Sequence, residues 1–156
     1  MKILVLYYSR SGRSRTVAQA IAQKLKTDIQ EIIPLKGYAG LFGFIRGGFQ
    51  ATRGKTPAIK PLVKDLATYD LVIFGTPIWG SRMASPLRTV ITENKPKIKK
   101  YAFYCTAGGA GQEKAFADVQ ELFSAAPVAV MELQSTEVDK GKAGEKIDTF
   151  IASLSR

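Results

Sequence analysis

Histidine is missing from the sequence, and cysteine occurs once, as Cys105. A lone cysteine excludes an internal disulfide and fits a reducing compartment such as the cytoplasm. Without histidine, Ser-His-Asp and Cys-His catalysis are excluded, and the chain lacks the usual ligands of a zinc or copper site, so we expect no metal. No other side chain stands out as a general acid or base. If the protein is a catalyst, we expect a cofactor to supply the chemistry.

Long apolar runs are also missing. No stretch reaches the roughly 18 apolar residues that a transmembrane helix needs. The N-terminal apolar run is too short for a secretory signal and leads into an arginine-rich turn, so we interpret it as a strand and expect a cytoplasmic protein. With 156 residues, 46% of them hydrophobic, the chain 1–156 is expected to form a single domain with a sizeable core.

Acidic residues are scarce. Lysine and arginine number 23 against 13 aspartate and glutamate, a formal net charge of +10, and no acidic residue occurs between Ile32 and Lys64. This balance predicts attraction to anions such as nucleotide cofactors, acidic proteins, nucleic acid or an anionic membrane surface. Because the basic residues are spread through the chain without a nucleic-acid-binding motif, we expect no nucleic-acid partner.

Along the chain, segments with the pattern of a strand alternate with segments with the pattern of a helix. This alternation predicts an α/β fold with a parallel sheet covered by helices on both faces. The predicted strands are Lys2–Tyr8, Ile29–Ile33, Leu71–Gly75, Tyr101–Thr106 and Val128–Leu133. The predicted helices are Ser14–Lys26, Ser85–Asn94, Gln112–Ala125 and Ala143–Leu154, with a short one at Lys60–Thr68.

The turn between the first strand and the first helix has the composition of a phosphate-binding loop. It contains Ser9, Ser11 and Ser14 together with Gly12, directly before a helix N-terminus. Helix N-termini offer unpartnered N–H groups and partial positive charge to anions. The loop matches neither G-x-x-x-x-G-K-[ST] nor G-x-G-x-x-G. Its pattern S-x-S-G-x-S suits one terminal phosphate monoester; an ordinary serine-capped turn is the alternative.

This pattern resembles the first loop of the flavodoxin family, [ST]-x-[ST]-G-x-[ST], which holds the phosphate of FMN. The resemblance, closest to the short-chain branch, implies a doubly wound five-stranded parallel sheet of order 2-1-3-4-5 with helices on both faces. It implies noncovalent FMN, rather than FAD, as the cofactor. The expected phosphate-binding residues are Ser9, Arg10, Ser11, Gly12, Arg13 and Ser14, with backbone and hydroxyl groups ahead of the arginines.

Two further loops extend the resemblance to nearly the whole chain. Thr76, Pro77, Ile78, Trp79 and Gly80 follow the third strand and correspond to the second flavin loop, in which Trp79 would lie against the ring unless it only packs in the core. The loop after the fourth strand would bring backbone amides to the pyrimidine end of the flavin. Its expected cofactor-binding residues are Thr106, Ala107, Gly108, Gly109 and Gly111.

The sequence departs from the family in two respects. Flavodoxin carriers are typically acidic, whereas this chain is basic. No aromatic residue lies between Tyr104 and Phe116 to cover the second flavin face, so we expect this face to be open or covered by the Tyr38–Phe49 segment.

An insert at about Lys36–Thr56, rich in glycine, aromatic and basic residues, fits the alternation badly. On a helix, Leu41, Ile45 and Phe49 share one face, and Gly40, Gly43 and Gly47 form a second face of small residues. Since each glycine costs about 1 kcal/mol relative to alanine, contacts must hold such a helix in place. The insert is either a cover over the sheet edge, a basic aromatic rim beside the flavin, or a docking surface for a membrane or an acidic partner.

The resemblance implies redox activity through FMN, either as an electron-transfer protein or as an FMN-dependent oxidoreductase. We favour electron transfer slightly, because the single short domain carries no recognisable nicotinamide site. The accessible flavin favours an NAD(P)H:quinone-type oxidoreductase instead. A cofactor-free basic interaction module on the same frame is a third hypothesis. The expected partners are accordingly an acidic redox protein, or NAD(P)H and a quinone.

Overall fold

The most apolar segments of the chain form the centre of a parallel sheet. In the computed structural model, which describes residues 1–155, strands β1 (Ile3–Tyr7), β3 (Leu71–Trp79) and β5 (Tyr101–Ala107) are buried along most of their length. The more polar strands β2 (Asp28–Glu31) and β6 (Val130–Gln134) lie at the two edges. Central strands of a parallel sheet are covered on both faces and are therefore continuously apolar. The place of each strand in this sheet, central or at an edge, thus follows from its composition.

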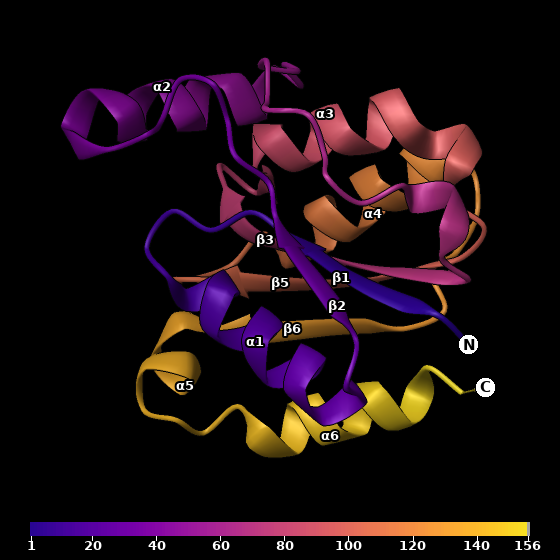
Figure 1. Ribbon diagram of the computed structural model, residues 1–156. Helices are drawn as coiled ribbons and strands as arrows, with labels where there is room; N and C mark the ends of the chain where they lie inside the picture. The colour runs from indigo at the N-terminus through magenta and orange to yellow at the C-terminus, as the bar shows by residue number, and fades with distance from the viewer. Residues whose placement is uncertain (156) are drawn as a thin grey trace.

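The parallel strands lie in the order β2-β1-β3-β5-β6 (Figure 1). The flavodoxin-like parallel sheet is therefore confirmed, but the expected count of five strands is wrong. A sixth strand, β4 (Arg82–Met83), pairs antiparallel with the end of β3. It was missed because it is two residues long and belongs to a tight hairpin rather than to the alternation of strands and helices.

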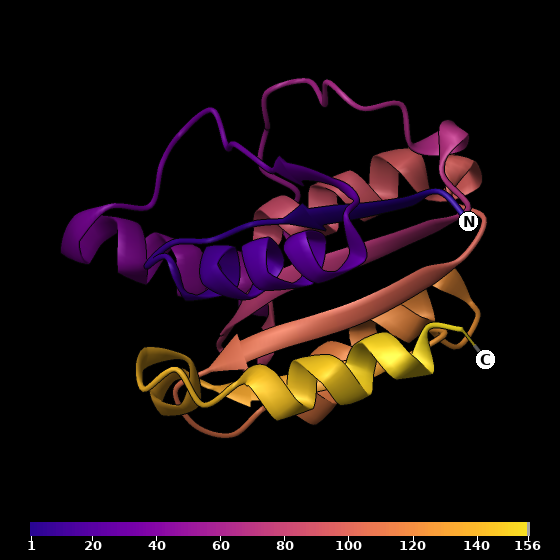
Figure 2. The same ribbon diagram turned by 60° about the horizontal axis from the view of Figure 1, so that its bottom comes forward.

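Helices cover both faces of the sheet (Figures 1 and 2). Helices α1 (Arg13–Leu25) and α6 (Gly144–Ser153) pack on one face with the short α5 (Ser135–Asp139). Helices α3 (Ser85–Asn94) and α4 (Gln112–Phe123) pack on the other. The sheet thus separates two hydrophobic clusters, which is the arrangement expected of a doubly wound fold. In residues 1–155 no helix is both long and apolar enough to cross a membrane.

Four helical segments refine the expectation. The insert forms α2 (Gly40–Thr52). The predicted helix Lys60–Thr68 is wrong except for a 3-10 turn at Leu66–Thr68, because the preceding residues bond to β2 and its extension instead: Lys60 N–H donates to Ile33 O at 2.7 Å. A second 3-10 turn, Lys95–Lys97, follows α3, and α5 was not predicted.

Gly75 of β3 leaves room for a hydrogen bond between the sheet and the start of α1. It lies opposite Tyr104 of β5, and a Cβ atom on Gly75 would come within 2.1 Å of the Tyr104 ring. The buried Tyr104 hydroxyl donates a hydrogen bond of 2.7 Å to the backbone carbonyl of Ser14 at the start of α1. The ring can therefore reach the helix only because position 75 has no side chain.

We predict that Gly75→Ala lowers the free energy of unfolding by about 2 kcal/mol or more, since the methyl group would overpack a rigid core. Urea denaturation measures the change. Gly144→Ala is the matched control, because a Cβ at Gly144, the first residue of α6, meets no atom within 4 Å. Equal stability of the two variants would contradict this account of Gly75.

Candidate functional site

Three loops meet at the carboxyl edge of the sheet. The loop after β1 contacts the end of β5 through Ser14 Oγ and Thr106 Oγ1, which lie 2.8 Å apart in the protein interior. The loop after β5 contacts the β3–β4 turn, where a Cβ on Gly111 would lie 2.6 Å from Ser81 Oγ. The structure thus brings together the three segments that the sequence proposed as one site.

The first loop presents backbone N–H groups at the N-terminus of α1. Gly12 has a positive φ of 97°, and its N–H donates to Ser9 Oγ at 3.0 Å. Within residues 1–155, no protein acceptor is bonded to the N–H groups of Arg13, Ser14 or Arg15, the first turn of the helix. With no acidic residue in that turn, these donors and the helix dipole favour a bound anion.

The arginines of this loop have partners within the protein. Arg10 donates through Nε to Tyr38 O at 2.8 Å, which ties the loop to the insert. Arg13 forms two hydrogen bonds of 2.8 Å with the Asp139 carboxylate and thereby lowers the pKa of that carboxyl group. Arg15 bonds to Glu31 at 2.7 Å. The unpartnered donors are therefore backbone groups.

The second loop is a β-hairpin. Strand β3 continues to Trp79, so the tryptophan is the last residue of a strand. The expectation that it stands on an open loop is wrong. Gly80 and Ser81 turn the chain with φ of 53° and 64°, and Arg82 pairs back with Trp79. Two central residues with positive φ are typical of type I′ hairpins.

The Trp79 ring is held in an aromatic cluster. Its centroid lies 5.3 Å from that of Tyr8 and 4.8 Å from that of Tyr38, both edge to face. Gly47 of α2 allows the helix to approach the indole, because a Cβ there would lie 3.0 Å from the ring. The ring orientation is thus fixed by residues from three separate segments.

An ion cluster that the sequence analysis missed anchors the hairpin. The Asp118 side chain on α4, only 7% exposed, accepts hydrogen bonds from Arg82 of β4 and from Arg88 of α3, the latter at 3.0 Å. It therefore joins the second loop to both helices on that face of the sheet. The three residues are far apart in the sequence and match no motif, so only the fold reveals them.

The third loop is fixed at one carbonyl and open at its glycines. Gly109 O accepts from Gln112 Nε2 at 2.9 Å and from Gln134 Nε2 at 3.3 Å. A Cβ at Gly108 or Gly109 would meet no atom within 4 Å, so free space borders this backbone. Cys105 precedes the loop inside the core, where burial raises the pKa of its thiol to about 12, which fits a packing role.

A cavity of about 340 Å³ lies between α2 and the β3–β4 hairpin. Its walls are mostly apolar, and Arg10 contributes the charged group. The lining residues are Arg10, Gly43, Phe44, Ile45, Gly48, Ile78, Trp79 and Gly80. The insert therefore covers part of the candidate site.

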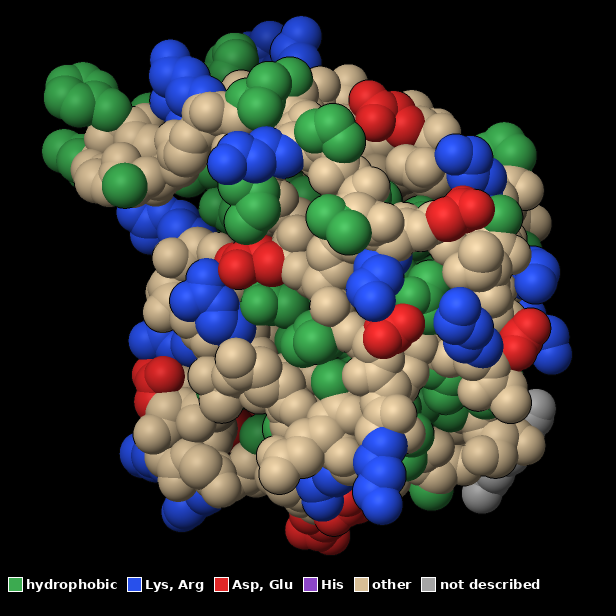
Figure 3. All heavy atoms as spheres, in the orientation of Figure 1, with side chains coloured by type: hydrophobic (Ala, Val, Ile, Leu, Met, Phe, Trp, Pro, Cys, Tyr) green, Lys and Arg blue, Asp and Glu red, His purple; other side chains and the backbone are tan. Residues whose placement is uncertain are grey.

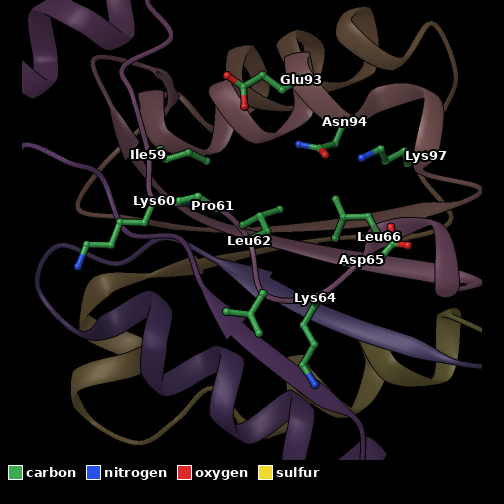
Figure 4. Close-up of a pocket in the computed structure, with 11 residues that line it drawn as sticks. Ile59, Lys60, Pro61, Leu62, Lys64, Asp65, Leu66, Glu93, Asn94 and Lys97 are labelled. Carbon is green, nitrogen blue, oxygen red and sulfur yellow. The ribbon is translucent and has the colours of Figure 1, made fainter.

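A larger cavity of about 510 Å³ lies elsewhere (Figure 4). It is bounded by segment Ile59–Leu66, by Glu93 and Asn94 at the C-terminal end of α3, and by Lys97 in the 3-10 turn that follows. None of its lining residues belongs to the three loops. We therefore place the candidate site at the carboxyl edge of the sheet and not in this cavity.

The site has the features that a phosphorylated flat ring requires. The free N–H groups at the start of α1 suit a phosphate, and a Cβ at Gly12 would meet no atom within 4 Å, so space remains beside them. Free space also borders Gly108 and Gly109, and an indole lies at the neighbouring hairpin. The backbone groups at Gly12, Gly108 and Gly109 thus leave room for the phosphate and the ring of an FMN molecule.

Comparison with known proteins identifies the family. Residues 1–141 match the model of the NADPH-dependent FMN reductase family, and the chain belongs to this family. A flavoprotein from Lactobacillus acidophilus NCFM, crystallised in complex with FMN, is 25% identical, with a TM-score of 0.74 over 89% of this chain and 97% of that one. Oxidised flavodoxin 2 from Bacillus cereus is 18% identical, with a TM-score of 0.64 over 99% and 98%.

These findings confirm three expectations from the sequence. The protein is an FMN-binding flavoprotein, its fold is flavodoxin-like, and its cofactor is FMN. The individual cofactor-binding residues stay predictions.

We predict that Asp118→Asn destabilises the protein by about 3 kcal/mol, because Arg88, whose side chain is 14% exposed, would lose its anionic partner in the interior. Chemical denaturation measures the loss. The control is Asp148→Asn, which removes an exposed ion pair with Lys24 and should cost less than about 1 kcal/mol. A similar loss in both variants would show that Asp118 acts as an ordinary surface carboxylate.

Proposed function

We propose that the protein is an oxidoreductase that oxidises NAD(P)H through noncovalent FMN and passes the electrons to a quinone-type acceptor. The match of residues 1–141 to the NADPH-dependent FMN reductase family carries this proposal. It shifts our preference away from the pure electron carrier that the small size of the domain favoured. When bound, FMN supplies the redox chemistry, and the protein binds and orients the reactants.

The α1 loop holds the phosphate in this proposal. The N–H groups of Arg13, Ser14 and Arg15 donate to its oxygens, and Gly12 lets the backbone approach. Ser14 also keeps this loop against β5, because its hydroxyl is paired with Thr106. Arg10, whose partner Tyr38 O is uncharged, contributes positive potential, whereas the charge of Arg13 is compensated by Asp139.

The second and third loops orient the ring. Gly108 and Gly109 offer backbone groups with space beside them, whereas Gly80, at the tip of the hairpin, is packed against Thr52 of α2. Trp79 supplies an aromatic wall whose orientation the tyrosine cluster fixes. The mostly apolar cavity beside Trp79 has room for a flat apolar acceptor such as a quinone. The buried, lone Cys105 supports a reducing compartment, the cytoplasm.

We predict that NADPH bleaches the flavin absorbance of the FMN-loaded protein under anaerobic conditions, and that adding a soluble quinone sustains NADPH oxidation. Stopped-flow absorbance near 450 nm and a steady-state assay measure the two steps. NADH in place of NADPH tests nucleotide preference. Flavin that stays oxidised with both nucleotides, yet exchanges electrons with a reductant protein, would instead support the carrier function.

We predict that Ser9→Ala weakens FMN binding about fivefold and leaves riboflavin binding unchanged. The variant removes the acceptor that orients the Gly12 N–H, a hydrogen bond worth about 1 kcal/mol, and riboflavin has no phosphate to sense it. Quenching of flavin fluorescence measures both affinities. Ser153→Ala, near the end of α6, is the control and should bind both flavins normally. Equal weakening for FMN and riboflavin would place the phosphate elsewhere.

A further inference from the structure

Helix α2 has two faces with opposite surroundings. Gly43, Gly47 and Ala51 are buried against the rest of the protein, where Gly43 and Gly47 contact Tyr38 and Trp79. The large apolar side chains of the helix point away from the core. They are Leu41 (70% exposed), Phe42 (87%), Phe44 (64%), Ile45 (57%) and Phe49 (52%). We call these five residues the apolar ridge.

The apolar ridge leaves more than half of each of its side chains exposed in the described part of the chain. An apolar side chain contributes hydrophobic free energy only when its surface is removed from water. A contiguous exposed apolar surface is therefore unusual on a protein that has no partner there. The ridge stands on a helix that projects from a corner of the molecule (Figure 1), and hydrophobic side chains gather at this projection (Figure 3).

Cations flank the apolar ridge. Arg10 lies over the Phe44 ring at 5.4 Å, and Arg53 lies over the Phe49 ring at 4.8 Å. Lys36 and Lys55 lie just outside the two ends of the helix, and no acidic residue occurs between Ile32 and Lys64. The ridge therefore combines apolar side chains with positive charge only.

We propose that α2 docks the protein on an anionic lipid membrane. Aromatic and aliphatic side chains enter the interface between headgroups and acyl chains, and the flanking basic residues attract anionic headgroups. A second copy of the chain is the poorer occupant, since it would bring basic surfaces together in a protein with a net charge of +10.

Docking would also orient the candidate site. Phe44 and Ile45 of the apolar ridge line the cavity next to Trp79 together with Gly43 from the buried side of α2, so a membrane bound by the ridge would lie directly beside this cavity. The docking proposal does not rest on the proposed enzymatic activity, because the surface exists without flavin or NADPH.

Vesicle flotation tests the proposal. We expect the protein to float with vesicles of phosphatidylglycerol and phosphatidylcholine, to float at least about fivefold less with phosphatidylcholine alone, and to be released progressively by salt. FMN binding, measured in parallel, reports on the separate flavin proposal. A protein that binds FMN but stays off the anionic vesicles would overturn membrane docking alone.

Two matched pairs of variants locate the contact. Phe42→Gln should lower the fraction bound to anionic vesicles at least about fivefold, whereas Val63→Gln, at a residue 88% exposed outside α2, should not. Lys55→Gln should weaken binding more than Lys140→Gln, another exposed lysine, remote in the sequence. Circular dichroism checks the fold, and Leu41→Gln replaces Phe42→Gln if that variant misfolds.

Two results would contradict the proposal even if the wild type floats. Equal binding by Phe42→Gln and Val63→Gln would show that charge alone attracts the protein. A wild-type dimer in sedimentation equilibrium that Phe42→Gln dissociates would identify a second copy as the occupant of the apolar ridge.

Discussion

Backbone N–H groups without protein acceptors are the constraint on which the site depends. The first turn of any helix has such donors, and in a parallel sheet the loops that lead into those helices meet at one edge. Here the Ser14–Thr106 hydroxyl pair and the contact between Gly111 and Ser81 hold three loops together at that edge. The site therefore consists mainly of main-chain geometry, which explains why a chain without histidine can still bind a phosphorylated cofactor.

The fold was largely predictable because segments that are buried in the structure are rich in apolar residues in the sequence. Strands β1, β3 and β5 are continuously apolar, and α1 shows a buried face that includes Val17 and Ile21. The errors occur where local signals are weak. The Gly80–Ser81 turn places serine at a positive φ, so the β3–β4 hairpin lacks the Asn-Gly or Asp-Gly pair that is typical of a type I′ turn. Segment Lys60–Thr68 has partly helical composition, but the N–H groups of Lys60 and Lys64 donate to Ile33 and Gln30, and only its last three residues form a 3-10 turn.

The loops of the site were predictable, whereas their side-chain contacts were not. Arg10, Arg13 and Arg15 look equivalent in the sequence, yet they bond to Tyr38, Asp139 and Glu31 on three different segments. Whether each of these arginines has a partner within the protein depends on carboxylate and carbonyl groups from distant parts of the sequence, which come close only in the folded structure. The same holds for Asp118, whose role follows from two arginines on separate elements.

Helix α2 shows how one segment can satisfy two demands. Its glycines lower helix propensity, but Gly43 and Gly47 are needed because Tyr38 and Trp79 leave no space for larger side chains. Packing therefore explains the small face completely. It does not explain Phe42 or Leu41, which touch little and would be more soluble as polar residues. The outer face of α2 is therefore the part of the segment that the proposed membrane contact would account for.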